Sequence, residues 1–211
     1  MKSKKHIIFD FDGVIIDSFQ TALSVEQITV PELDDETYRI LFEGNINKVE
    51  GYQNESLKKI KHDEVFWSEY TKRVLRDAQL FPKMQDVITQ LSNQYSLSVI
   101  SSSISSLISD MLSREHLEQY FEEILGNDVH PSKIEKIKMI FDKYDLSPED
   151  CVFVTDTLGD IREGNQVGVG SIGVTWGFHS VEVLAQGNPF RLINHPDQLI
   201  ETISDYFVVK K

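Results

Sequence analysis

Strand-length apolar runs alternate with segments of helical spacing over most of this chain. Between the runs, apolar residues recur every three or four positions, as in Ile104, Leu107 and Met111, which is the spacing of an amphipathic helix. This alternation predicts an α/β fold, a Rossmann-like three-layer sandwich whose mainly parallel sheet is covered by helices on both faces. The six predicted strands lie at 6–9, 97–100, 123–125, 151–154, 171–174 and 191–193.

The interval from residue 17 to residue 80 breaks this rhythm. It contains no strand-like run, whereas Phe66, Tyr70 and Val74 recur at helical spacing and the acidic run 34–36 favours a helix start. We therefore expect a small α-helical domain, residues 17–80, inserted into a core domain formed by residues 1–16 and 81–211. Phe81-Pro82 marks the return of the chain to the core.

The net charge and the cysteine content limit which binding partners and which cellular compartment we expect for this protein. The 211 residues carry a formal net charge of -13, so the chain repels nucleic acid and anionic membrane surfaces. The first apolar run is broken by Asp10 and Asp12, which argues against a signal peptide or a membrane span. The only cysteine, Cys151, lies in a strand-like run and is interpreted as a buried thiol in a reducing cytoplasm.

The strongest chemical signal is a pair of aspartates at the end of the first predicted strand. Asp10 and Asp12 would point to the same side if the strand continued, and their charges would repel unless a cation or a proton intervened. Such a pair suits a hard metal ion, or a carboxylate nucleophile beside an acid/base group. The alternative is a pair of solvated acids.

Hydroxyl groups follow the second predicted strand. Ser101, Ser102 and Ser103 precede the helix that begins near Ile104. Hydroxyls and backbone amides at a helix start form a phosphate cradle. Ser103 as an ordinary N-cap is the alternative.

A third site lies at the start of the helix near residue 133. Ser132 and Glu135 have the spacing of a capping box, and Lys133 falls in the first turn, where the helix dipole disfavours a cation. A bound anion would resolve this conflict. Lys136, one turn later, suits the same role, and either lysine could instead be solvated surface.

Two further aspartates follow the fourth predicted strand. Asp156 leaves the strand end, and Asp160 lies four residues later at the start of a predicted helix. Together with Asp10 and Asp12, they could supply the oxygen ligands that Mg²⁺ prefers. N-capping explains Asp160 as well, but not Asp156.

Taken in order, these four sites resemble the four signature motifs of the haloacid-dehalogenase-like superfamily. The resemblance covers residues 6–16 and 81–205. The inserted helices resemble the cap domain of the subfamily that includes phosphoglycolate phosphatase and β-phosphoglucomutase. The resemblance implies a magnesium-dependent phosphatase that hydrolyses a small phosphorylated metabolite through an aspartyl-phosphate intermediate.

Roles for the motif residues follow from the resemblance by position. It implies that Asp10 is the nucleophile and a metal ligand, and that Asp12 is the acid/base whose carbonyl also reaches the metal. Lys133 is then a catalytic cation that binds phosphate. The dehalogenating members of the superfamily lack an acidic residue at the position of Asp12, so the resemblance argues against halide displacement. The phosphate-binding residues are Ser101, Ser102 and Lys133, and the magnesium ligands are Asp10, Asp12, Asp156 and Asp160.

Some features depart from the pattern or leave the function open. Thr155 stands where glycine is usual, which we expect to alter backbone detail only, and no proline follows Lys133, so the choice between Lys133 and Lys136 stays open. Trp176 and Phe178 are expected to pack as aromatic residues. A phosphomutase acting on a sugar phosphate would use the same residues. A non-catalytic binding protein of the same fold is a further alternative, and the presence of every charged motif residue argues against it. The sequence predicts neither the substrate nor the oligomeric state.

Overall fold

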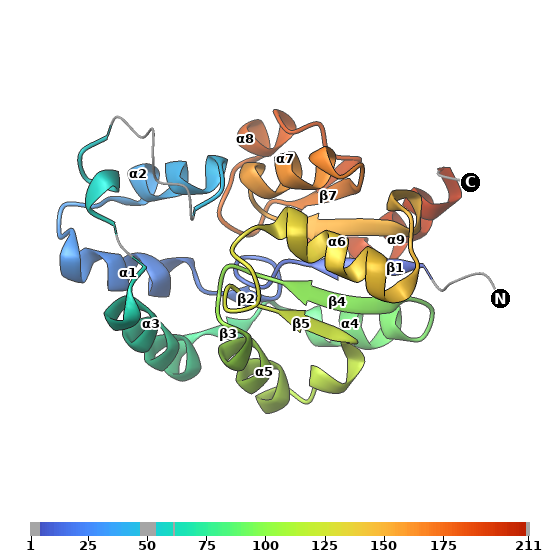
Figure 1. The fold of residues 1–211 in the computed structure, drawn as a ribbon, viewed down its shortest axis with the longest axis horizontal. Helices are drawn as coiled ribbons and strands as arrows, with labels where there is room; N and C mark the ends of the chain where they lie inside the picture. The colour runs from blue at the N-terminus through green and yellow to red at the C-terminus, as the bar shows by residue number, and fades with distance from the viewer. Residues whose placement is uncertain (1–4, 47–53, 61, 210–211) are drawn as a thin grey trace.

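The computed structural model describes residues 5–46, 54–60 and 62–209 and has a six-stranded parallel sheet at its centre (Figure 1). The strand order is β5-β4-β1-β6-β7-β8, and every neighbouring pair is parallel. All six strands coincide with the predicted runs to within one residue, so the predicted α/β sandwich is confirmed. The strands are β1 (His6–Phe9), β4 (Ser96–Ile100), β5 (Glu123–Leu125), β6 (Cys151–Thr155), β7 (Gly170–Val174) and β8 (Arg191–Ile193).

Helices cover both faces of this sheet because its strands are apolar on both sides. Ile7 and Phe9 of β1 belong to the core cluster that contains the apolar faces of α4, α5 and α9, whereas Ile8 packs with residues of α6 on the opposite face. Cys151 is fully buried on the α6 face, as predicted. The core helices are α4 (Met84–Ser92), α5 (Ser105–Arg114), α6 (Lys133–Tyr144), α7 (Leu158–Gln166), α8 (Val181–Ala185) and α9 (Gln198–Val209), with short 3-10 helices at Glu118–Tyr120 and Pro148–Asp150. In the part of the chain that the structure describes, no helix combines the length and apolarity needed to cross a membrane.

The inserted segment is helical and extends from one end of the sheet (Figure 1). Asp34 caps α2 by accepting a hydrogen bond from the Thr37 amide, as its acidic start predicts. Ile28 and Val65 lie on the inserted helices but face solvent. The elements are α1 (Phe19–Thr29), α2 (Asp35–Ile40) and α3 (Glu64–Asp77), with 3-10 helices at Leu41–Glu43 and Leu57–Lys59.

Two short strands that the sequence did not predict connect the insertion to the core. Strand β2 (Ile16–Asp17) pairs with β3 (Gln79–Leu80) in an antiparallel two-stranded sheet. This pairing brings together the two points where the chain leaves and re-enters the core. The division at residues 17 and 80 therefore remains our proposal for the domain boundaries, and we call residues 17–80 the cap.

The strand order determines where a ligand can bind. Strand β1 lies between β4 and β6, and the chain passes outward to β5 before it returns to β6 on the other side of β1. Loops diverge at such a switch point, and they leave a crevice beyond the carboxyl ends of the strands. Asp10, Ser101 and Asp156 follow β1, β4 and β6 directly, so the three neighbouring strand ends bring three of the predicted sites together.

Candidate active site

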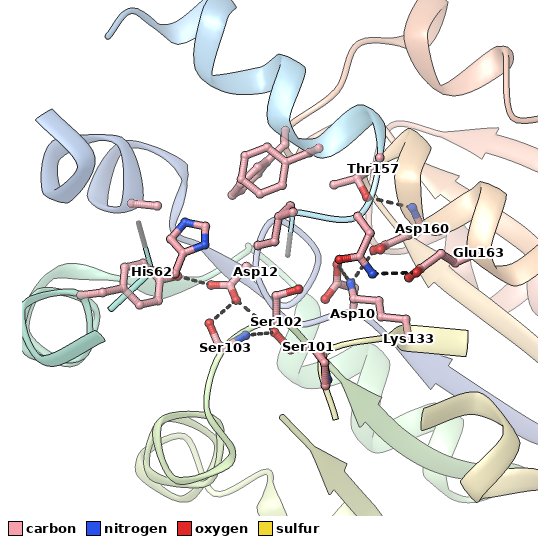
Figure 2. A pocket seen from close by; sticks show the side chains of 18 of the residues that line it. Asp10, Asp12, His62, Ser101, Ser102, Ser103, Lys133, Thr157, Asp160 and Glu163 are labelled. Carbon is pink, nitrogen blue, oxygen red and sulfur yellow. Dashed lines mark hydrogen bonds and ion pairs between the residues drawn. The ribbon is translucent and has the colours of Figure 1, made fainter. Parts of the chain in front are cut away.

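A pocket lies between the carboxyl ends of the core strands and the cap (Figure 2). Its volume is about 70 Å³. Asp156 is not among the lining residues and lies beneath them, fully buried. Six of the predicted site residues line the pocket: Asp10, Asp12, Ser101, Ser102, Lys133 and Asp160.

Lys133 lies between two buried carboxylates. Its Nζ is 2.7 Å from Oδ2 of Asp10 and 2.5 Å from Oδ2 of Asp160. The other oxygen of Asp10, Oδ1, accepts a hydrogen bond of 2.7 Å from the Phe11 amide. Both oxygens of Asp10 therefore have a fixed partner, and its carboxylate is held at the end of β1.

Burial and neighbouring charges shift the pKa values in this cluster in opposite directions. Burial raises the pKa of Asp10 well above its usual value, and Asp160 and Asp156 add to this, while Lys133 opposes it. Burial also acts to raise the pKa of Asp160, but the contacts with Lys133 and Asp10 outweigh it and the pKa is lowered. Burial disfavours the charge of Lys133, yet its two carboxylate partners raise its pKa. The cluster thus holds Lys133 as a cation. It contains three aspartates, and the single positive charge of Lys133 cannot neutralise all of them.

Lys136 occupies a different place from Lys133. It is fully buried, and its Nζ donates to the carbonyl oxygens of Ser101 at 2.5 Å and of Gly126 at 3.4 Å. Burial, with the nearby charge of Lys133, lowers its pKa to about 8. Lys136 therefore ties α6 to the loops that follow β4 and β5, and it does not line the pocket.

Hydroxyl groups surround the Asp12 carboxylate. Its Oδ1 accepts from Ser18 at 2.8 Å and from Tyr70 at 2.5 Å, and its Oδ2 accepts from Ser101 at 3.2 Å and from Ser103 at 2.7 Å. The sequence pointed to the hydroxyls of Ser101 and Ser103, but it gave no indication of those of Ser18 and Tyr70. Ser18 follows β2, Ser103 lies in the loop after β4, and Tyr70 belongs to cap helix α3, so groups from the core and from the cap meet at Asp12 (Figure 2).

The serine loop differs from the predicted helix start. Helix α5 begins at Ser105, so Ser103 is not its N-cap, and the Ser105 amide donates to Asp128 at 2.7 Å. The Ser103 amide donates to Oγ of Ser101 at 2.9 Å. The three serines therefore form a loop that precedes the helix, and the hydroxyls of Ser101 and Ser103, rather than the α5 amides, reach Asp12.

Two helix starts near the site are also capped differently from the prediction. The Ser132 side chain makes no capping hydrogen bond, so the expected capping box with Glu135 does not form. Helix α7 is capped by Thr157, whose hydroxyl accepts from the Asp160 amide at 3.3 Å, so Asp160 is not an N-cap. The carboxylate of Asp160 instead accepts from the hydroxyl of Thr155 at 2.8 Å. The expectation that Thr155 alters only backbone detail was therefore wrong.

Asp156 lies in a tight cradle of backbone. Its Oδ2 accepts from the Phe178 amide at 2.7 Å. A Cβ atom added to Gly13 would lie 2.0 Å from this oxygen, and one added to Gly177 would lie 2.3 Å from it. Only glycine fits at these two positions without displacing Asp156. Burial raises the pKa of Asp156 to about 7, and Oδ1 of its carboxylate has no hydrogen-bond partner among the described residues.

A buried carboxylate oxygen without a partner fits a bound cation. Within residues 5–46, 54–60 and 62–209, however, no group of three or more His, Cys, Asp or Glu side chains is arranged to hold a metal ion. The four carboxylates thus do not converge on one point, because that of Asp12 faces hydroxyls and that of Asp160 faces Lys133 and Thr155. The role expected for Asp12 toward the metal was through its backbone carbonyl. Mg²⁺ commonly binds through one or two carboxylates, with waters and substrate phosphate completing its shell. Asp10 and Asp156 are suited to supply these one or two carboxylates.

Aromatic side chains of the cap form the wall of the pocket opposite Asp10. Phe66 and Tyr70 of α3 lie with their ring planes 8° apart, and Trp67 meets Tyr70 nearly edge-on at 79°. Phe178 of the core packs edge-on against Phe19 and Phe42 of the cap, which agrees with its predicted packing role. The core and the cap therefore meet through ring contacts around the pocket.

A histidine that the sequence did not single out joins the core to the cap. The Leu158 amide donates to Nδ1 of His179 at 2.9 Å, and Nε2 lies 2.9 Å from the Arg39 carbonyl. Burial lowers the pKa of His179, so the ring is neutral and carries its proton on Nε2. His179 thus links the start of α7 to cap helix α2. Its position next to Phe178 was the only signal for it in the sequence.

Comparison with known proteins agrees with the fold and the motifs. The family model of the haloacid dehalogenase-like hydrolases matches residues 7–174. The chain is 26% identical over 208 residues to a phosphoglycolate phosphatase of Synechococcus elongatus, covering 94% of this chain and 96% of the relative. It is 27% identical over 215 residues to a phosphoglycolate phosphatase of Aquifex aeolicus, and this match covers 96% of this chain and 98% of the relative.

Solved structures show the same fold. A haloacid dehalogenase-like family hydrolase of Streptococcus pneumoniae superimposes with a TM-score of 0.77 at 24% identity, covering 96% of this chain and 100% of that protein. Because the family model spans most of the chain, from β1 to β7, family membership follows directly. The chain belongs to the haloacid dehalogenase-like hydrolases.

Proposed function

We propose that this protein is a phosphatase that hydrolyses a small phosphate monoester through an aspartyl phosphate on Asp10. The observation that carries the proposal is the position of Asp10 at the end of β1, with Lys133 Nζ at 2.7 Å and Asp12 two residues away in the same pocket. A fixed carboxylate beside a buried cation is suited to accept a phosphoryl group, because positioning and charge neutralisation supply most of the acceleration in phosphoryl transfer.

The proposed reaction has two steps. A carboxylate oxygen of Asp10 attacks phosphorus while the bond to the leaving oxygen breaks, and Asp12 donates its proton to that oxygen, which departs as an alcohol. Asp12 then takes a proton from water as the water attacks phosphorus, which releases phosphate and restores Asp10. The hydroxyls around Asp12 can support both of its protonation states, because a hydroxyl both donates and accepts hydrogen bonds.

The phosphoryl oxygens would be bound by Lys133, Ser101 and Ser102. Lys133 is the better candidate for the motif lysine than Lys136, since its Nζ lies in the pocket against Asp10 whereas Nζ of Lys136 donates to two carbonyl groups. Substrate would share Lys133 with Asp10 and Asp160, so the charge of Lys133 would serve both the nucleophile and the phosphate.

Mg²⁺ is the proposed cofactor. Asp10, Asp156 and the Asp12 carbonyl would hold it, and Asp160 would support it through water. When bound, the ion would neutralise charge on the phosphoryl oxygens and on the carboxylates. Two features support this assignment: the partnerless Oδ1 of Asp156 and the excess of acid over base around Asp10.

The relatives named as phosphoglycolate phosphatases support hydrolysis of a small phosphorylated metabolite. The net charge of -13 supports a partner other than nucleic acid or an anionic membrane. The single buried Cys151 fits the cytoplasm, which we keep as the proposed location.

Substitution of Asp10 by asparagine tests the proposal. We expect Asp10→Asn to retain the fold and to lose turnover of p-nitrophenyl phosphate in Mg²⁺, while Asp110→Asn, an exposed aspartate on α5, keeps it. Acid quenching of the wild-type reaction should yield a peptide phosphorylated at Asp10. Turnover that survives in Asp10→Asn would contradict the mechanism, and an isomer of a hexose phosphate in place of free phosphate would identify a phosphomutase.

A further inference from the structure

The two halves of the pocket differ in chemistry. The core half carries the carboxylates, hydroxyls and Lys133 that surround the proposed phosphoryl site. The described lining residues of the cap half carry no acidic side chain, and five of them are aromatic: Tyr38, Phe42, Phe66, Trp67 and Tyr70. A monoester whose phosphoryl group faces Asp10 must direct its leaving group toward these rings.

We propose, on the basis of the phosphatase function above, that the leaving group of the preferred substrate is an uncharged alcohol that carries a ring. The alternative leaving group is a small alcohol that carries a carboxylate, such as glycolate. The charges around the pocket and the shape of its cap wall decide between them.

The basic side chains that line the pocket do not offer a free charge to a carboxylate. Among the described lining residues these side chains are Lys133 and His62. Lys133 already faces Asp10 and Asp160. Arg39, the nearby cap arginine, places its guanidinium carbon 3.9 Å from the ring centre of Phe19 and does not line the pocket.

His62 has a buried carboxylate next to it. Its Nε2 lies 2.9 Å from Oε1 of Glu26, which is only 2% exposed. A carboxylate that approached His62 from the pocket would therefore enter the field of Glu26 at close range, where little water screens the repulsion. An uncharged group avoids this cost.

The wall beside His62 favours a flat apolar group. The His62 ring lies 4.6 Å from Phe66 and 5.8 Å from Trp67 between centroids. Phe66 in turn stacks on Tyr70 with 5.6 Å between the ring centroids, and the Tyr70 hydroxyl donates a hydrogen bond to Asp12. This row of rings leads from the proposed acid/base toward the outer pocket, and aromatic side chains bind rings through offset and edge-to-face contacts.

Two substrates of similar chemical reactivity test the proposal. Benzyl phosphate and 2-phosphoglycolate are both alkyl monoesters, and the first has a ring where the second has a carboxylate. We expect wild-type kcat/KM to be at least tenfold higher for benzyl phosphate. A preference for 2-phosphoglycolate, lost in His62→Ala, would overturn the proposal and identify His62 as a carboxylate receptor.

Two variants test the two parts of the argument separately. Trp67→Leu should lower kcat/KM for benzyl phosphate at least fivefold more than for 2-phosphoglycolate, whereas Trp67→Phe should keep most of the preference. Glu26→Gln retains a hydrogen-bonding oxygen but removes the charge, so it should raise the relative activity on 2-phosphoglycolate severalfold. Equal effects on both substrates would refute the assignment. Absence of any Asp10-dependent turnover would instead refute the phosphatase function itself.

Discussion

Replacement of Lys133 by methionine isolates the charge that separates two buried carboxylates. Methionine keeps most of the unbranched apolar stem but removes the ammonium group, so Asp10 and Asp160 lose their shared cation. Removal of one partner from a buried ion pair costs about 3–5 kcal/mol, because the remaining charge is neither solvated nor paired. Both carboxylates are nearly buried, with side-chain exposures of 7% and 11%. We therefore expect the free energy of unfolding to fall by about 3–5 kcal/mol near neutral pH without metal.

The loss should depend on pH in a defined direction. Without Lys133, burial and mutual repulsion raise the folded-state pKa values of Asp10 and Asp160 above their unfolded values. A group with a raised pKa stabilises the fold fully below its unfolded pKa, and this contribution is lost as pH rises through the folded pKa. The deficit of Lys133→Met relative to wild type should therefore be larger near about pH 8 than near about pH 5.

Urea denaturation in EDTA, followed by far-UV circular dichroism at both pH values, measures this difference. Lys138→Met is the matched control, since Lys138 lies on the same helix and pairs at the surface with Glu135. It should change the unfolding free energy little, because exposed ion pairs contribute little. If both variants lost the same stability, or if the deficit of Lys133→Met grew on acidification, the electrostatic reasoning would be wrong.

Two further predictions concern the cradle of Asp156. Burial raises the pKa of Asp156 to about 7, so its contribution to stability is lost as pH rises through that value. Asp156→Asn should therefore stabilise the metal-free protein more near about pH 8 than near about pH 5, and it should remove stabilisation by added Mg²⁺ in thermal denaturation. Gly13→Ala places a Cβ atom 2.0 Å from Asp156 and should cost more unfolding free energy in urea than Gly168→Ala, which has a similarly positive φ but a nearest contact of 3.4 Å. Stabilisation of Asp156→Asn by Mg²⁺ as large as that of wild type would contradict the first prediction, and equal losses for both alanine variants would contradict the second.

The strands of the core were predictable because their signal is local. Each one is a continuous apolar run, and burial on both faces of a parallel sheet requires such runs. The strands β2 and β3 were missed for the opposite reason. Each has two residues, too few to show a period, and each depends on a partner at the other end of the cap.

The site residues were also predictable only where their signal in the sequence is local. Asp10, Asp12 and Asp156 were identified because acids directly after buried strands are conspicuous. Lys133 and Lys136 could not be distinguished, since residues three apart share one helix face, and only tertiary structure places one in the pocket and the other under the loops. Tyr70 was assigned to the apolar face of its helix, and nothing local indicates that its hydroxyl reaches a residue 58 positions away.

Several local rules are broken around Asp10, and the breaks share one physical cause. Lys133 lies at a helix start where a cation is disfavoured, Asp156 is buried with a partnerless oxygen, and Gly13 adopts a positive φ that brings backbone against that carboxylate. Proteins accept such conflicts mainly at functional sites, where binding of a ligand relieves them. A phosphoryl group beside Lys133 and a cation beside Asp156 would relieve both at once. Under the proposed function, the features that destabilise the free protein are those that would favour binding of a phosphate ester together with a metal ion.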